Sequence, residues 1–314
     1  MKEKTKKLLF EYSRNSRITT KELGKKIRTS QQSASYLKNQ LISKKIIQST
    51  AIIDAVKLGF INVLVGFNFI KTDYETKREL INELKQKESI IQIEEGKEGI
   101  DLLVEYSVHN LSAFNKINIE IVTKYQEKLR SVFVLPIIVN HEYSLNYLSR
   151  KFDSNDLVLS GDRVIRKLSD NELKVLTEIS NYPSKSLIDI SDSIKLPVKT
   201  VINLKKSLEK KFIIKGYGSS LDHIKLHINR QIIFLRFTPE SMKDIDEFHL
   251  FTQNNKNIIK FTKTIGEYQI IIVAESLRDL EVIKDIRANF PIEKYFIVKP
   301  EKIHKKRYLP EGND

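Results

Sequence analysis

A polar run near the N-terminus places hydrogen-bonding side chains on one face of a helix. Gln32, Tyr36 and Asn39 recur at intervals of four and three residues, and Ala34 and Leu41 fall on the opposite, apolar face. Glutamine and asparagine can each make paired hydrogen bonds to the edge of an adenine. Such a helix could therefore enter a DNA groove, although amphipathic helices more often simply cover a core.

The candidate DNA contacts fall into two groups by side-chain chemistry. Polar side chains on and beside the exposed face are candidates for reading base edges, and they are Gln31, Gln32, Ser33, Ser35, Tyr36 and Asn39. Flanking cations would hold phosphates and set the register without reading sequence, and they are Lys25, Lys26, Arg28, Lys38, Lys44 and Lys45.

The net charge of +14 is concentrated around this helix. Residues 1–50 contain thirteen Lys or Arg and three acidic residues, whereas residues 51–150 contain twelve and fourteen. A localised positive field favours a polyanionic partner and predicts salt-dependent binding. The alternative is a solvated, lysine-rich surface that reflects codon bias.

The polar helix is expected to be the third of three short helices. Residues 4–14 form the first, and a second follows the N-cap candidates Thr19 and Thr20. Ser30 then caps the third helix, which makes a helix-turn-helix. The apolar residues from Ile46 to Ile52 are expected to add a small β-wing.

From Phe60 the periodicity changes to short apolar strands alternating with helices. The order through residue 139 is βαββαβ, which predicts a ferredoxin-like α+β sandwich with both helices on one sheet face. The uncovered sheet face should seek a partner, either within the chain or on a second chain.

The whole arrangement is repeated at a constant offset along the chain. Residues 8–47 align without a gap with residues 175–214, and Gly99 and Gly266 keep the same offset. The fold class is therefore α+β, with two winged helix-turn-helix domains alternating with two ferredoxin-like domains. The expected boundaries are 1–56 and 57–143 for copy one, a linker at 144–166, and 167–226 and 227–314 for copy two, the last with a basic tail at 304–308.

The second polar helix is more basic than the first. Its DNA-facing candidates are Lys199, Thr200, Asn203 and Lys206. Phosphate attraction should outweigh base reading here, so copy one is expected to read sequence and copy two to anchor. If both helices engage one DNA face, their half-sites should lie about 10 base pairs apart or a multiple of that.

The composition excludes several classes of site. With no cysteine, disulfides, thiolate nucleophiles and cysteine-ligated zinc are absent, and no apolar run approaches the roughly 18–20 residues of a membrane span. The six histidines are dispersed in sequence, and only His223 and His227 have metal-like spacing. We therefore expect no metal, no cofactor and a cytoplasmic location.

The alternation of domains resembles the leucine-responsive and asparagine-responsive (Lrp/AsnC) transcriptional regulators. The resemblance covers almost the whole chain, twice. It rests in copy one on RITTKELGKKI, LISKKIIQSTAIID, DAVKLG and GIDLLVEYSV, and in copy two on LIDISDSI, LEKKFIIKG, DHIKLH and TIGEYQIIIVAES. The family's glycine near the end of the third helix is replaced by Lys45 and Phe212, which predicts a different helix end.

The resemblance implies a transcriptional regulator that binds double-stranded DNA and is not an enzyme. It also implies a small effector such as an amino acid, bound near the glycine turns at Gly99, Asp101, Gly266 and Tyr268. A homo-oligomer through the sensor-domain sheets is a further expectation. Two alternatives stay open: a two-module decarboxylase of the siroheme pathway, and an assembly protein whose second copy no longer binds DNA.

Overall fold

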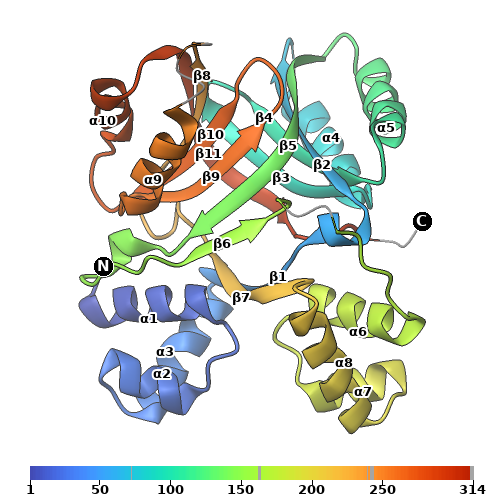
Figure 1. The fold of residues 1–314 in the computed structure, drawn as a ribbon, viewed down its shortest axis with the longest axis vertical. Coiled ribbons are helices and arrows are strands. Elements are labelled where there is room, and N and C mark those ends of the chain that lie inside the picture. The colour runs from blue at the N-terminus through green and yellow to red at the C-terminus, as the bar shows by residue number, and fades with distance from the viewer. Residues whose placement is uncertain (72, 162–163, 239, 241–243, 312–314) are drawn as a thin grey trace.

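The computed structural model consists of a layer of helix-turn-helix units and a larger body of strands flanked by helices (Figure 1). It describes residues 1–311 except 72, 162–163, 239 and 241–243. No helix among the described residues is long and apolar enough to cross a membrane. The α+β fold class is confirmed.

The two helical units have the same element bounds, displaced by the offset that relates the two copies in the sequence. The first contains α1 (Glu3–Arg14), α2 (Thr20–Ile27) and α3 (Gln31–Ser43), and the second contains α6 (Asp170–Asn181), α7 (Leu187–Ile194) and α8 (Val198–Lys210). Helices start where the sequence offers a cap. Thr19 and Glu22 form a capping box at α2, and Ser169 and Glu172 form one at α6.

The strand after each helical unit pairs with the strand of the other copy. β1 (Ile47–Ile53) runs antiparallel to β7 (Ile214–Leu221), so neither copy forms the local β-wing that the sequence predicted. Side chains of β1 enter both helical cores: Ile47 packs with α1–α3, whereas Ala51 and Ile53 pack with α6–α8. The two-stranded sheet of β1 and β7, in which each copy pairs its strand with that of the other, is called the exchanged ribbon. It therefore holds the two helical units together.

Each copy continues into a βαββαβ unit in the predicted order. The first contains β2 (Ile61–Phe69), α4 (Tyr74–Gln86), β3 (Ile90–Glu98), β4 (Leu102–Val108), α5 (Leu111–Lys124) and β5 (Leu129–Tyr143). The second contains β8 (Asn229–Phe237), α9 (Ile245–Asn254), β9 (Ile258–Thr264), β10 (Ile270–Ser276), α10 (Val282–Asn289) and β11 (Ile292–Lys306).

The two sheets join at both edges into a closed ring. The strand order is β2-β4-β3-β11-β8-β10-β9-β5, and β5 also pairs with β2. β5 and β11, of 15 residues each, make the closure because each pairs within its own copy and also with the other. The inner sheet faces enclose a shared apolar core that includes Phe133, Phe234 and Tyr268.

The closed ring shows what covers the sheet faces that the helices leave free, which the sequence left open. The inner sheet faces cover each other within one chain, and the helices α4, α5, α9 and α10 lie outside (Figure 1). The surface expected to join a second chain is therefore already occupied.

Two segments are more ordered than the sequence suggested. The expected linker contains a 3-10 turn at Asn146–Leu148 and a strand, β6 (Asp156–Leu159), which pairs with β5. The expected basic tail at 304–308 instead begins in β11, opposite β3. Its side chains are engaged as well, since His304 bonds to Glu95 at 2.6 Å and Tyr308 to Glu142 at 2.7 Å.

Candidate nucleic-acid interface

The turn between α2 and α3 is short because three local features favour it. Arg28 adopts a left-handed conformation that ends α2, and Ser30 caps α3 by accepting a hydrogen bond from the Ser33 N–H at 3.2 Å. A Cβ atom on Gly24 would lie 3.0 Å from the Thr29 carbonyl oxygen, so this close approach favours glycine. The turn fixes α3 against α2 with its polar face outward.

The polar face of α3 is exposed as predicted. Ala34 and Leu41 are buried, whereas Tyr36 is 72% exposed and projects beside Gln32 and Asn39. Of the candidates for base reading, only Ser35 is half-buried; Gln31, Gln32, Ser33, Tyr36 and Asn39 are exposed. Within the described part of the chain, no hydrogen bond occupies the side chains of Gln31, Gln32, Tyr36 or Asn39.

The cations around α3 differ in how freely they could meet phosphates. Lys25, Arg28 and Lys44 are exposed, and no ion pair in the described residues holds them. Lys26 is bound to Glu11 at 2.7 Å, and Lys38 is half-buried. The first three are therefore the strongest phosphate candidates of copy one.

The prediction that the third helix ends differently from a left-handed turn is wrong. Lys45 and Phe212 have φ values of 52° and 55°, the conformation usually taken by glycine. The N–H of Ile46 bonds to the Leu41 carbonyl at 2.9 Å, and the N–H of Lys45 bonds to that of Ile42 at 2.8 Å. These paired bonds satisfy the end of the helix and offset the strain of the side chain.

In the second unit, α8 exposes more lysine than α3 does, and the unit also exposes apolar side chains. Lys199, Asn203 and Lys206 are exposed on α8, and Thr200 is half-buried. Ile188 and Phe212 are 61% and 62% exposed, so this unit also presents apolar surface. This combination keeps open the alternative that copy two binds a protein.

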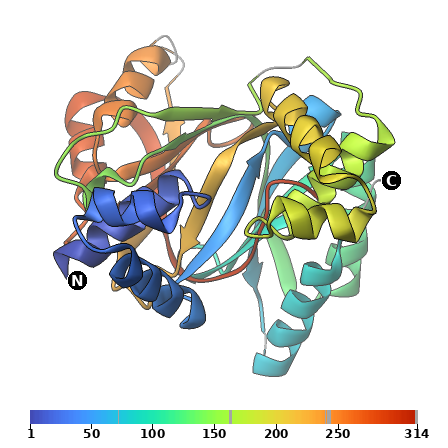
Figure 2. The same ribbon diagram turned by 90° about the horizontal axis from the view of Figure 1, so that it is seen from below.

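Both helical units lie on the same side of the strand body. Figure 2, seen from below, shows α1–α3 and α6–α8 as two clusters on either side of the exchanged strands. A single chain therefore presents two helix-turn-helix units with different outward faces, which is the arrangement expected of a covalent pseudo-dimer.

The predicted effector residues occupy packing positions in this structure. Gly99, with φ of 94°, lies against β11, where an added Cβ atom would come 2.6 Å from the Ile297 carbonyl oxygen. The Asp101 carboxylate accepts the Phe69 N–H at 2.8 Å, and Tyr268 is buried in the core between the sheets. Gly266 lies against Leu135. None of the four lines the cavity inside the ring or the cleft beside β11.

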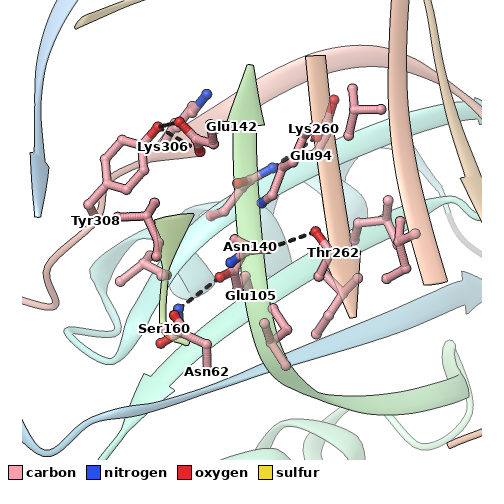
Figure 3. A pocket seen from close by; sticks show the side chains of 18 of the residues that line it. Asn62, Glu94, Glu105, Asn140, Glu142, Ser160, Lys260, Thr262, Lys306 and Tyr308 are labelled. Carbon is pink, nitrogen blue, oxygen red and sulfur yellow. Dashed lines mark hydrogen bonds between the residues drawn. The ribbon is translucent and has the colours of Figure 1, made fainter. Parts of the chain in front are cut away.

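The interior of the ring contains a polar cavity beside the apolar core. Glu142 accepts from the Tyr308 hydroxyl, Thr262 donates to Asn140 at 2.6 Å, and Asn62 donates to Glu105 at 3.1 Å (Figure 3). The cavity volume of about 80 Å³ suits a few water molecules, not a drug-sized ligand. Burial lowers the pKa of Lys306, which lines it.

Two of the residues that line this cavity, Arg230 and Glu94, belong to a buried ion network. Arg230 on β8 donates to Glu94 on β3 at 3.0 Å and to Glu275 on β10 at 2.5 Å. Tyr147 also donates to Glu275, at 2.7 Å. Burial acts to raise the pKa of Glu94, but the charge and the hydrogen bond of Arg230, together with smaller contributions from His223 and Lys306, hold that pKa below its usual range. Sequence reasoning missed this network, although the charges embedded in apolar strands were a usable signal.

A larger cleft lies between the exchanged ribbon and the second half of β11. Its volume is about 800 Å³, within the range of ligand pockets. Seven lysine or arginine side chains line it against three carboxylates. The cations are Lys45, Lys85, Lys225, Lys302, Lys305, Lys306 and Arg307, and His223 and His304 add two imidazoles. The cleft is therefore suited to an anion with several negative charges.

Comparison with known proteins shows the fold and leaves the family open. No protein-family model matches the sequence, and no curated protein matches it. The crystal structure of the siroheme decarboxylase NirDL matches 99% of this chain and 94% of its own, at 12% identity and a TM-score of 0.59. Its co-complex with an iron-uroporphyrin III analogue matches at 13% identity, with the same coverage and TM-score.

Structures of regulators match slightly less than half of the chain. The LrpC structure from B. subtilis covers 45% of this chain and all of its own, at 23% identity and a TM-score of 0.38. An AsnC family transcriptional regulator from Agrobacterium tumefaciens covers 46% at 15% identity and a TM-score of 0.40. The full-length fold is thus the one that NirDL has.

The full-length match corrects one expectation. The sequence led us to expect a protein that is not an enzyme, but the architecture over nearly the whole chain is that of an enzyme. The dispersal of histidines along the sequence was a poor guide, because residues far apart in the chain can line one cleft, as His223 and His304 do.

Proposed function

We propose that this protein is a double-stranded DNA-binding transcriptional regulator acting as a covalent pseudo-dimer. The observation that carries the proposal is the polar face of α3. There, the side chains of Gln32, Tyr36 and Asn39 are exposed and have no hydrogen-bond partner among the described residues. The exposed cations Lys25, in the last turn of α2, and Arg28, at its C-cap, belong to the preceding helix of the motif. A helix face that only keeps the protein soluble needs neither amide side chains that can make paired hydrogen bonds to a base nor surrounding positive charge.

The two helical units would meet DNA with different roles. Copy one reads base edges with Gln32 and Asn39, whereas Lys199 and Lys206 of copy two hold phosphates. Because the two faces differ, the preferred site has unlike half-sites about 10 base pairs apart or a multiple of that. A small effector near the glycine turns remains part of the proposal only as the resemblance implies it.

Substitution of single side chains separates the two roles. A duplex would first be selected from a random library by the full chain. Gln32→Ala or Asn39→Ala is expected to weaken binding to the selected duplex by about 1–3 kcal/mol and binding to random duplex only a little, because only base contacts are lost. Lys25→Ala is expected to weaken binding to the two duplexes about equally. Equal losses on both duplexes for all three variants would contradict the division of roles.

The cationic cleft favours a second candidate, the decarboxylation of siroheme or a similar carboxylate-rich tetrapyrrole. Its volume and positive charge match a large polyanion, and the 80 Å³ interior cavity could not hold one. The exposed cations Lys45 and Lys302 would bind substrate carboxylates. This reaction breaks a carbon–carbon bond, releases CO2 and puts a proton on the carbon left behind.

His304 is the side chain in the cleft best placed to supply that proton. It is bonded to Glu95 at 2.6 Å and is largely buried. Burial lowers the pKa of His304 despite the neighbouring carboxylate. The protonated form of His304 is populated only at pH values below the usual pKa of a histidine, so a rate that depends on His304 as proton donor should rise as the pH falls below that value.

Siroheme binding tests this candidate directly. Titration into the wild-type chain is expected to shift the tetrapyrrole absorbance, and the Lys45→Glu/Lys302→Glu variant should bind at least about tenfold more weakly, because two attractive charges become repulsive. A matched variant, Lys97→Glu/Lys116→Glu, changes exposed lysines outside the cleft and should bind like wild type. No absorbance shift, or equal weakening in both variants, would remove siroheme from consideration.

A further inference from the structure

Two histidines and an aspartate from three different elements meet beside the closed ring. His141 lies on β5, Asp156 on β6 and His249 on α9. One potential ligand atom from each lies within 4.8 Å of the other two. His249 comes from the second copy and is far from the other two in sequence, so no spacing pattern reveals the cluster.

The separations suit a small metal ion. His141 Nδ1 lies 2.9 Å from an Asp156 oxygen, and His249 Nε2 lies 3.6 Å from the same oxygen. Metal–ligand bonds of about 2.0–2.1 Å in tetrahedral geometry put neighbouring ligand atoms ~3.3 Å apart. Both histidine–aspartate separations are therefore within a few tenths of an ångström of the spacing that a shared metal ion requires, and the two histidine nitrogens lie within 4.8 Å of each other.

His249 supplies an independent observation. Its Nε2 is buried and has no hydrogen-bond partner among the described residues, which is costly for a polar atom. The ring is held in place by its neighbours, with the His141 ring centroid at 4.2 Å and that of Phe261 at 5.0 Å. The unpaired nitrogen therefore has a fixed position near the carboxylate of Asp156.

We propose that His141, Asp156 and His249 bind one divalent transition-metal ion such as Zn²⁺. Two imidazoles and one carboxylate are a donor set that zinc and its first-row neighbours accept, whereas Ca²⁺ and Mg²⁺ prefer all-oxygen sites. The side chains are 13%, 16% and 23% exposed, so solvent can reach the ion and complete its coordination.

The position of the site suggests what the ion does. It joins β5 of copy one, the connecting strand β6, and α9 of copy two. The connecting segment also holds the first helical unit, since Asp153 bonds to Arg14 of α1 at 2.7 Å and to Ser144 at 2.5 Å. The bound ion would therefore fix this connector beside α1 and stabilise the whole chain.

Metal titration of the full chain after treatment with a chelator tests the proposal. Calorimetry with Zn²⁺ and visible absorption with Co²⁺ are expected to give one equivalent of bound ion. At about 100 times the Kd, Zn²⁺ should raise Tm by about 5 °C. His249→Phe keeps an aromatic ring against Phe261 but removes the nitrogen, so it should fold without metal and lose at least about tenfold in affinity.

Two further variants make each outcome decisive. His141→Gln removes a second ligand and should also weaken binding, whereas His227→Ala removes a histidine outside the cluster and should bind like wild type. Wild-type affinity in both His249→Phe and His141→Gln, or no ion bound by the wild-type chain, would overturn the site and leave His141 and Asp156 as an ordinary hydrogen-bonded pair.

Discussion

Replacing Arg230 by methionine is expected to lower the free energy of unfolding by about 3–5 kcal/mol, because it leaves two buried carboxylates without their shared cation. Arg230 is 9% exposed, and its partners Glu94 and Glu275 are 1% and 8% exposed. The network also joins β3 of copy one to β8 and β10 of copy two, so its loss weakens the contact between the copies. Denaturant unfolding at pH 7 measures the effect.

The pH dependence of this difference identifies its cause. The folded-state pKa of Glu94 lies below its ordinary value of 4.5, so its stabilisation is present above that pH and is lost as the pH falls through the folded-state pKa. Without Arg230, burial would raise that pKa and the carboxyl group would protonate readily. The stability difference between variant and wild type should therefore begin to shrink above pH 4.5, as Glu94 protonates in the variant, and shrink further as the pH falls through the lowered folded-state pKa of Glu94 in the wild type.

Arg236 on the same strand provides the matched control. It pairs with Glu293 at 3.2 Å, but both side chains are more than 40% exposed. An exposed pair contributes about 0–1 kcal/mol, so Arg236→Met should change stability little. If Arg230→Met cost no more than Arg236→Met, the buried network would not be what joins the two copies.

The second large effect is expected on DNA affinity. Changing Lys25, Arg28 and Lys44 together to glutamine should weaken duplex binding by about 10²-fold at low salt, because three phosphate contacts are lost. The slope of log K against log salt should also fall by nearly three, at about 0.9 per contact. Fluorescence anisotropy over a series of salt concentrations measures both quantities.

The control variant carries the same change in net charge elsewhere. Lys97, Lys116 and Lys256 are exposed and lie in the two sheet domains. Their replacement by glutamine should leave both the affinity and the salt slope near wild type. If the two triple variants lost affinity equally, net charge and not the α3 face would explain the binding.

The sequence predicted what depends on local signals. Caps at Thr19 and Ser30 and apolar spacing located α2 and α3, and the internal repeat located their counterparts α7 and α8. The buried and exposed faces of α3 also followed from the spacing, because an α-helix has about 3.6 residues per turn in any surroundings. The βαββαβ order was predictable for a similar reason, since strand and helix periodicities are local.

The features that sequence could not predict depend on partners distant in the chain. β1 is apolar enough to form a wing, but whether it pairs locally or with β7 depends on two helical cores from opposite halves of the chain. The sequence of the second half of β11 predicts a charged tail. This segment is a strand only because it pairs with β3, which is distant in the chain. The contacts of Arg230 with Glu94, and of His141 with His249, exist only after the ring has closed.

The most direct test of the proposed DNA binding is a comparison of two dissociation constants. Duplexes would be selected from a random library by the full chain, and Kd would be measured at about 0.15 M salt for the selected sequence and for a shuffled one. We expect the selected duplex to bind at least about 10³-fold more tightly, as specific regulators do. Equal affinities, or a library that yields no enriched sequence, would contradict the proposal that this chain reads DNA.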